Sequence, residues 1–153
     1  MNVFRIAKSN YIQDLSGEGA RIYGGRWNRP GVAVLYTSQA RSLAMLELIV
    51  HFSALNAMKE QYSFLNLSIP DEYIESIDLN LLKNIQFGLN NNKLWELTED
   101  YFFRKNILAL KVPSVLIPEE FNVLLNPLHP NYQLIKKINI LEIDIDDRFK
   151  KFF

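Results

Sequence analysis

A single carboxylate stands in an otherwise apolar stretch of the sequence. Residues 39–57 read QARSLAMLELIVHFSALNA, and helical spacing places Glu47 in one stripe with four apolar residues. These four are Ala40, Leu43, Val50 and Ala54. A carboxylate buried in such a stripe is costly unless it is paired or hydrogen-bonded. Glu47 therefore serves either a structural ion pair, with an arginine of the preceding loop, or the chemistry of a site.

The loop GGRWNRPG at 24–31 is the second stretch that could do chemistry. Gly24 and Gly25 permit positive φ angles and a close approach of the backbone to a ligand. Arg26 follows at once, so backbone N–H groups and a guanidinium meet at one place, which suits a pyrophosphate or a carboxylate. Trp27 is interpreted as a packing anchor in preference to a stacking surface. The segment is neither a GxGxxG fingerprint nor a Walker A loop.

A third polar group lies in the proline-rich segment VPSVLIPEEFNVLLNPLHP at 112–130. Its prolines favour an extended, rigid path, which can line a polar ligand pocket. Among the polar side chains of this segment, Ser114, Asn122, Asn126 and His129 are the candidates to contact a ligand. Ser114 lacks the G-x-S-x-G setting of a hydrolase nucleophile, so we expect it to donate or accept a hydrogen bond.

Composition narrows the kind of ligand. The 153 residues hold 17 basic and 17 acidic side chains, and this neutral balance without a basic stripe argues against nucleic-acid binding. Five of the seven arginines nevertheless lie within the first 41 positions, which favours a small anionic ligand. The chain has no cysteine and two histidines, so we predict no metal site. No apolar run spans a bilayer and no signal peptide is apparent, so we predict a cytoplasmic protein that binds no membrane.

Hydrophobic periodicity predicts the elements that must position these residues. Strands are expected at 3–7, 32–36, 62–69, 108–112, 115–117 and 141–145. Helices are expected from an N-cap at Ser38 to about residue 58, at 78–85 and at 93–105, with 8–31 as a loop. The strands are short and do not alternate regularly with helices. We therefore predict one α+β domain over 1–153 with a mixed, largely antiparallel sheet.

Two blocks of sequence together resemble a known family. The first is GARIYGGRWNRPGVAVLYTS followed by the helix with Glu47, and the second is VPSVLIPEE with the LLNP and HP that follow. In this order they resemble the RES-domain family, the toxins of RES–Xre toxin–antitoxin pairs. The resemblance implies a fold similar to that of ADP-ribosyltransferase toxins. It also implies that NAD+ is a substrate and not a cofactor, and that it is lost by hydrolysis or by phosphorolysis with inorganic phosphate.

The resemblance assigns roles to seven residues. The catalytic ones are Glu47, Arg26 and Tyr36, and those expected to bind substrate are Arg5, Gly25, Ser114 and Asn126. In this assignment Glu47 either stabilises the ribose cation or holds the ribose hydroxyls and orients the incoming water or phosphate. Arg26, with Arg5, holds the pyrophosphate. Tyr36 stacks on nicotinamide or ribose, while Ser114 and Asn126 hydrogen-bond the nicotinamide amide or the ribose.

The family also implies a partner, an Xre-type helix-turn-helix antitoxin, and allows a homodimer within that complex. Two other functions stay open. One is transfer of ADP-ribose to a protein, which needs the same pocket and an acceptor surface. The other is a non-catalytic binding module in which Glu47 and Arg26 form a buried ion pair.

Overall fold

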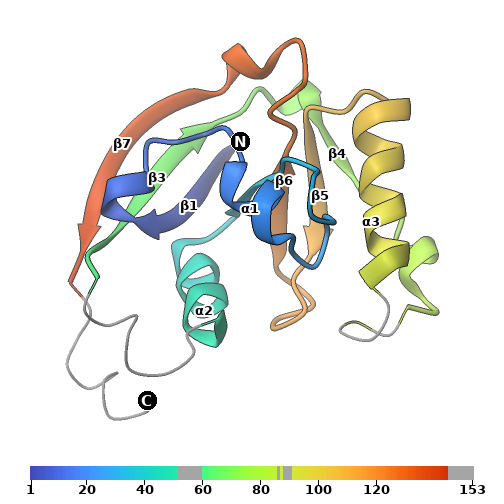
Figure 1. Ribbon diagram of the computed structural model, residues 1–153, viewed down its shortest axis with the longest axis horizontal. Helices are drawn as coiled ribbons and strands as arrows, with labels where there is room; N and C mark the ends of the chain where they lie inside the picture. Colours follow the sequence, from blue (N-terminus) through green and yellow to red (C-terminus); the bar gives the residue numbers. More distant parts are fainter. Residues whose placement is uncertain (52–59, 86, 88–90, 145–153) are drawn as a thin grey trace.

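The computed structural model describes residues 1–51, 60–85, 87 and 91–144, and within them the framework is a seven-stranded sheet (Figure 1). Its strands are β1 (Asn2–Lys8), β2 (Leu35–Ser38), β3 (Tyr62–Ser68), β4 (Ile74–Ser76), β5 (Ala109–Pro113), β6 (Phe121–Leu125) and β7 (Lys136–Ile143). They lie in the order β4-β5-β6-β2-β1-β3-β7. Only β4 and β5 pair in parallel among these strands, so the predicted mixed, largely antiparallel α+β sheet is confirmed.

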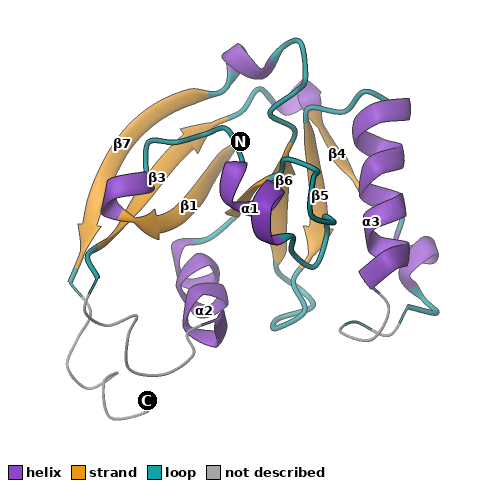
Figure 2. Cartoon of the chain, viewed as in Figure 1, coloured by secondary structure: helices purple, strands orange, loops and turns teal. Residues whose placement is uncertain are grey.

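Three α-helices accompany the sheet in the described ranges: α1 (Glu18–Tyr23), α2 (Arg41–His51) and α3 (Asn91–Glu99). Helix α3 continues into a π-helical turn at Asp100–Arg104. Short 3-10 turns occur at Ser9–Tyr11, Asp71–Tyr73, Leu79–Leu82 and Tyr132–Leu134. Figure 2 shows α3 beside β4 and β5, whereas α2 lies near the middle of the sheet. No helix in these parts of the chain is long and apolar enough to cross a membrane.

The sheet carries an apolar core on each face because strand side chains alternate. In β6, Val123 and Leu125 join one cluster, which also contains Val3 and Leu65. Leu124 points to the opposite face and joins a second cluster around Trp27, Leu94 and Phe102. The loop 24–31 contributes Trp27 to this second cluster and helix α3 contributes Leu94. Trp27 is therefore a buried packing anchor, as predicted.

Several element boundaries differ from those predicted. The strand expected at 32–36 is β2 at Leu35–Ser38, because its limits are set by pairing with β6 from Leu35↔Leu125 to Ser38↔Asn122. Ser38 therefore ends a strand and does not cap the next helix, and its hydroxyl donates to Asn122 Oδ1. Helix α2 begins at Arg41, and the part of the expected helix beyond residue 51 lies outside the described residues.

Other differences involve turns. The strand expected at 115–117 is a turn in which Ser114 Oγ accepts the N–H groups of Leu116 and Ile117, and the chain reverses there into β6, which was not predicted. The expected helix at 78–85 is a single 3-10 turn, capped at its start by the Asp78 carboxylate. Helix α1 lies inside the expected loop 8–31, and β7 begins at Lys136 instead of 141.

Helix α2 is less buried than its composition suggests. Only Leu43 and Ala44 are buried along its described length, and Val50, expected in the buried stripe, is 58% exposed. The helix packs by one side against β1 and β2. Glu47 is likewise half-buried, so a ligand can reach its carboxylate.

Candidate active site

A cavity of about 610 Å³ opens between helix α2, helix α1 and the loop 24–31. This volume falls within the range of small-molecule sites. Its described lining comes from five parts of the chain: Phe4 and Ile6; Gly19, Ala20 and Tyr23–Trp27; Tyr36–Ser38; Ala44, Glu47 and Leu48; Pro113, Val115 and Asn122. Of these lining residues only Arg26 and Glu47 carry a charge. Arg26 can pair with an anionic group of a ligand, and Glu47 can stabilise a positive charge that develops on the same ligand.

Glu47 enters the cavity from the middle of α2, and one of its two oxygens is held firmly. Oε1 accepts hydrogen bonds from Ser114 Oγ at 2.9 Å and from Asn122 Nδ2 at 2.7 Å. Oε2 has no hydrogen-bond or ionic partner among the described residues. The carboxylate is thus oriented through one oxygen and keeps the other for a ligand.

The two donors are fixed in turn by the sheet. Asn122 is the second residue of β6, and its Oδ1 accepts a hydrogen bond from Ser38 Oγ at 2.6 Å. Ser114 follows β5, and its Oγ accepts the N–H groups of Leu116 and Ile117 while donating to Glu47. Each donor therefore has its orientation set by a second hydrogen bond, which directs its proton to the carboxylate.

The loop with Arg26 is rigidly built. Gly24 has a φ of 70°, a conformation that suits glycine, whereas Gly25 does not have a positive φ. Gly25 is needed for space instead, because an added Cβ would lie 2.6 Å from the hydroxyl oxygen of Tyr36. That hydroxyl accepts the N–H of Trp27 at 3.1 Å and donates to Asn28 Oδ1 at 2.8 Å. Burial raises the pKa of Tyr36, so the phenol stays protonated as this donor.

Arg26 itself makes no hydrogen bond or ion pair with any described residue. It lines the cavity beside Tyr36, on whose phenol it has an electrostatic effect. The ion pair between Arg26 and Glu47 that the binding-module hypothesis requires is therefore not what the structure shows. Its guanidinium is left available for an anion.

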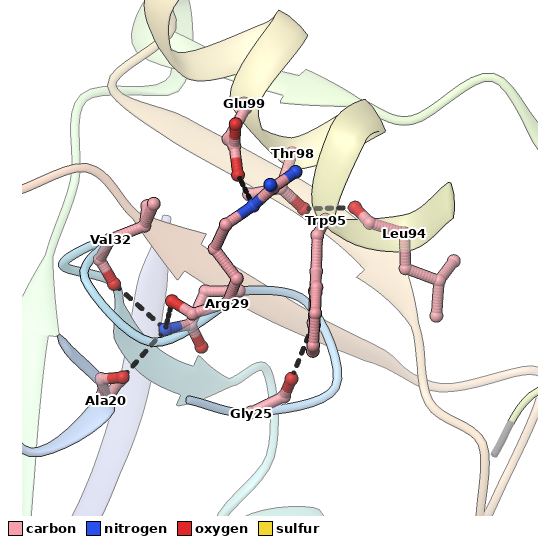
Figure 3. A network of polar contacts seen from close by, with 9 residues as sticks. Ala20, Gly25, Arg29, Val32, Leu94, Trp95, Thr98 and Glu99 are labelled. Carbon is pink, nitrogen blue, oxygen red and sulfur yellow. Dashed lines mark hydrogen bonds and ion pairs between the residues drawn. The ribbon is translucent and has the colours of Figure 1, made fainter. Parts of the chain in front are cut away.

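Helix α3 clamps the same loop through the side chains of Trp95 and Glu99 (Figure 3). Trp95 Nε1 donates to the carbonyl of Gly25 at 2.9 Å. Arg29 forms an ion pair with Glu99, with 2.6 Å between Nε and Oε1, and its guanidinium lies 5.9 Å from the centre of the Trp95 ring. The backbone that presents Gly25 and Arg26 is therefore attached to a helix from the middle of the chain.

Two residues expected to bind substrate lie elsewhere. Arg5 sits between Phe4 and Ile6, which line the cavity, so alternation along β1 turns Arg5 to the opposite face. There its Nη2 donates to the Tyr11 carbonyl at 3.3 Å, and burial lowers the pKa of its guanidinium, partly offset by Asp14.

Asn126 is also outside the cavity. Its Nδ2 donates to the carbonyls of Phe102 and Ile107, each at 3.3 Å, and its Oδ1 accepts the N–H of Leu128 at 3.1 Å. With 2% of its surface exposed, Asn126 secures the turn after β6. We therefore leave Arg5 and Asn126 out of the candidate site and include Asn122. Asn122 is one of the polar side chains of the proline-rich segment named from the sequence, but its contact with Glu47 depends on the strand pairing of β6.

Comparisons with known proteins show which family the chain belongs to. The sequence profile of the RES domain matches residues 2–146. A Photorhabdus laumondii protein named Toxin Res is 30% identical over 154 residues, which cover 99% of this chain and 98% of that protein. A Sphingobium protein named Prs ADP-ribosylating toxin is 35% identical over 134 residues, or 85% of this chain and 83% of that protein.

A solved structure shares the fold. One chain in the crystal structure of the M. tuberculosis MbcT–MbcA toxin–antitoxin complex superposes with a TM-score of 0.75 at 15% identity. The match covers 93% of this chain and 83% of the other. This match shows that the two chains share a fold. The 35% identity to the Sphingobium ADP-ribosylating toxin, over 83% of that protein, supports the expected likeness to the fold of ADP-ribosyltransferase toxins.

Proposed function

Because the chain belongs to the RES-domain family of toxins, we propose that it depletes NAD+ by cleaving the bond between nicotinamide and ribose. The observation that carries this proposal is Glu47, a carboxylate in the cavity with one oxygen held by two donors and the other unpaired within the described chain. The acceptor of the ribose is water or inorganic phosphate. The products are nicotinamide and either ADP-ribose or its phosphorylated form.

The chemistry requires only one carboxylate. The nicotinamide of NAD+ is cationic, so when the C–N bond breaks its nitrogen takes the electron pair and leaves neutral, without a general acid. The ribose then carries positive charge, which Glu47 stabilises through Oε2. Water or phosphate forms the new bond at the same carbon, and in hydrolysis the water loses a proton to solvent. In an ordinary glycoside the leaving oxygen would depart as an alkoxide, so glycosidases use a second carboxyl group to protonate it. Cleavage of NAD+ needs no such group, because nicotinamide leaves as a neutral molecule.

Arg26 supplies the complementary charge. Its guanidinium has no ionic partner in the described chain, and a planar fork with five donors suits a pyrophosphate. Gly25 lines the cavity next to Arg26, and we assign its backbone to the binding of the same group. Tyr36 lines the cavity, and we assign its ring to stack on nicotinamide or ribose. Ser114 and Asn122 are assigned to orient Glu47 instead of contacting nicotinamide.

A second activity has its own support. The Sphingobium relative is named an ADP-ribosylating toxin, so transfer of ADP-ribose to a protein is the alternative reaction at the same site. We further propose that an Xre-type helix-turn-helix antitoxin neutralises this chain, since the matching solved structure is a toxin–antitoxin complex.

The decisive experiment follows nicotinamide release from NAD+ by purified protein. We expect release by the wild-type chain and its loss in Glu47→Gln, because the amide keeps the shape of the side chain and removes its charge. Glu72→Gln, at an exposed glutamate outside the cavity lining, is the matched control and should behave as wild type. Near-wild-type release by a folded Glu47→Gln protein would refute the mechanism.

The acceptor is then identified with NAD+ labelled in its adenylate phosphate. Label in free ADP-ribose indicates hydrolysis, and a phosphate-dependent product indicates phosphorolysis. Label attached to a protein indicates transfer. In bacteria, expression of the chain alone should stop growth and lower cellular NAD+, and co-expressed antitoxin should relieve both effects. Growth arrest at unchanged NAD+ would favour protein modification.

A further inference from the structure

Helix α1 gives the cavity its most solvent-exposed wall. Three of its residues line the cavity: Gly19, Ala20 and Tyr23. Tyr23 follows Ala20 by three positions and Gly19 by four, so all three lie on one side of the helix. Gly19 and Tyr23 are exposed, whereas each of the other lining residues that the structure describes is half-buried or buried. The mouth of the cavity therefore lies along this side of α1.

Tyr23 is a large aromatic residue without a partner in the described chain. It is 82% exposed, and it forms no hydrogen bond or ring contact with the described residues. The other tyrosine of the cavity, Tyr36, uses its hydroxyl to hold Trp27 and Asn28. An exposed aromatic ring at the mouth of a polar cavity is typical of a surface on which a ligand stacks. The ring of Tyr23 is available for that purpose.

Space is left on the helix beside this ring. Side chains in a helix tilt toward its N-terminus, so Tyr23 and the position of Gly19 belong to neighbouring parts of one surface. A Cβ added at Gly19 would have no atom of the described chain within 4 Å. Glycine is among the least favourable residues inside a helix, and here it leaves the backbone beside the ring uncovered. A flat group can therefore lie over Gly19 and against Tyr23.

The arrangement of the charged residues indicates which part of NAD+ reaches this wall. Under the proposed function, the ribose next to nicotinamide lies at Glu47, which two donors hold against the sheet, and the pyrophosphate lies at Arg26. Adenosine is attached to the other end of the pyrophosphate, so it extends from Arg26 away from Glu47. Tyr23 precedes Arg26 by three residues and lies at the mouth. Adenine is a planar base, and such bases stack on aromatic side chains.

We propose, resting on this function, that Tyr23 stacks on the adenine ring of NAD+ and that Gly19 leaves room for it. The two residues form an adenine subsite at the mouth, and the dinucleotide runs inward from there past Arg26 to Glu47. Tyr23 thus favours substrates that carry a base beyond the pyrophosphate. It acts on binding and not on bond cleavage, because adenine is stacked equally in the ground state and in the transition state.

Calorimetry in the Glu47→Gln background tests this subsite with two ligands. ADP-ribose contains adenine, whereas nicotinamide mononucleotide lacks it. Tyr23→Ala should weaken ADP-ribose binding about tenfold or more, and should change binding of the mononucleotide less than about twofold, since only a base–aromatic stack is lost. Tyr23→Phe should keep the affinity for ADP-ribose because it keeps the ring. Tyr11→Ala is the matched control, since Tyr11 is 63% exposed and lies outside the described cavity lining.

Two results would overturn the adenine subsite: unchanged ADP-ribose affinity in Tyr23→Ala, or an equal loss for both ligands. The first result, beside nicotinamide release that depends on Glu47, would refute the subsite and leave the proposed function intact. A chain that neither releases nicotinamide nor binds ADP-ribose would refute both.

A second test fills the space at Gly19. Gly19→Leu should lower ADP-ribose affinity about tenfold or more, because the added side chain occupies the place of the adenine ring, and leucine favours the helix. Gly19→Ala adds one methyl group and serves as the control with near-wild-type affinity. In steady-state turnover of NAD+, Tyr23→Ala should raise KM and leave kcat unchanged, which is the effect of losing uniform binding. A lower kcat at unchanged KM, or equal affinities of the two Gly19 variants, would contradict the assignment.

Discussion

At the scale of single residues, the two oxygens of Glu47 have different tasks. Oε1 receives both donors, Ser114 Oγ and Asn122 Nδ2, while Oε2 has no partner in the described structure. A carboxylate on a helix can rotate about its side-chain bonds, and each rotation that is prevented lowers the cost of reaching the reactive geometry. The donors thus act on the reaction by fixing the position of a charge.

The two asparagines of the proline-rich segment provide a matched pair. We predict that Asn122→Ala lowers kcat about 10- to 100-fold, the effect of losing a hydrogen bond to a charged group, with a smaller change in KM. Asn126→Ala removes bonds to Phe102 and Ile107 instead, so it should lower the free energy of unfolding by about 1–3 kcal/mol. Steady-state NAD+ turnover and urea unfolding of both variants measure this. Equal effects of the two variants on kcat would contradict the assignment of Asn122.

Arg26 is predicted to hold the pyrophosphate. Arg26→Ala should weaken binding of ADP-ribose about 10- to 100-fold, since a charge-assisted bidentate contact is lost. Arg26→Lys should recover only part of the affinity, because an ammonium lacks the planar fork. Calorimetry in the Glu47→Gln background measures both, with Arg21→Ala as control, since Arg21 pairs with Glu18 at an exposed site. Unchanged ADP-ribose affinity in Arg26→Ala would show that the cavity binds pyrophosphate by other means.

At the scale of elements, the loop 24–31 owes its shape to helix α3. A glycine-rich loop has many accessible conformations, and fixing each residue costs about 1–2 kcal/mol of conformational entropy. The contacts of Trp95 with Gly25 and of Glu99 with Arg29 offset this cost from outside the loop. Helix α3, which contributes no residue to the described cavity lining, therefore governs how well the cavity is organised.

Loss of the tryptophan hydrogen bond is predicted to loosen this loop. Trp95→Phe keeps an aromatic ring and removes Nε1, so the Gly25 carbonyl loses its donor. We expect ADP-ribose affinity to fall several-fold, with a loss of about 0.5–1.5 kcal/mol in unfolding free energy. Phe103→Leu, at an exposed aromatic residue of the following turn, controls for general effects on this region. Hydrogen exchange of the loop amides should rise in Trp95→Phe, and unchanged exchange and affinity would rule out the clamp.

At the scale of the whole molecule, two half-buried tyrosines, Tyr36 and Tyr132, couple folding to alkaline pH. Burial is the largest cause that raises the pKa of Tyr36 and of Tyr132 above the usual value near 10. Each hydroxyl donates a hydrogen bond, from Tyr36 to Asn28 and from Tyr132 to the Leu15 carbonyl. Above pH 10 the unfolded chain releases these protons while the folded chain retains them. The contribution of these two tyrosines to the free energy of unfolding is therefore fully present below about pH 10 and decreases as the pH rises further.

We predict that the urea concentration at the midpoint of unfolding decreases as the pH is raised from about 9.5 to about 11.5, a range that includes the ordinary tyrosine pKa. Each phenol contributes a slope of at most about 1.4 kcal/mol per pH unit. Tyr36→Phe and Tyr132→Phe should each reduce the slope, whereas Tyr23→Phe should not, because Tyr23 is 82% exposed. A slope that the first two substitutions leave unchanged would assign alkaline unfolding to other groups.

Much of the local structure could be predicted from the sequence. The strands β1 and β3 follow from alternation, and the helix at 93–105 is realised as α3 with its π-helical turn. Two site residues could also be predicted from local patterns. Arg26 follows two glycines, and Glu47 interrupts an apolar helical stripe; both are features of neighbouring residues. Both side chains line the same cavity, while their catalytic roles stay predictions.

The sequence by itself thus determined the two charges, their local elements and the α+β class. Only the tertiary structure decided what surrounds those charges. Asn122 and Ser114 meet Glu47 across 75 and 67 residues of sequence, and strand pairing between β2, β5 and β6 sets which asparagine arrives there. The exposure of α2 and the clamp from α3 likewise depend on which elements pack together. Hydrophobic periodicity depends on neighbouring residues, so it indicates which face of a single element is buried. Strand register and packing depend on contacts between residues far apart in the sequence, so they could not be predicted from local patterns.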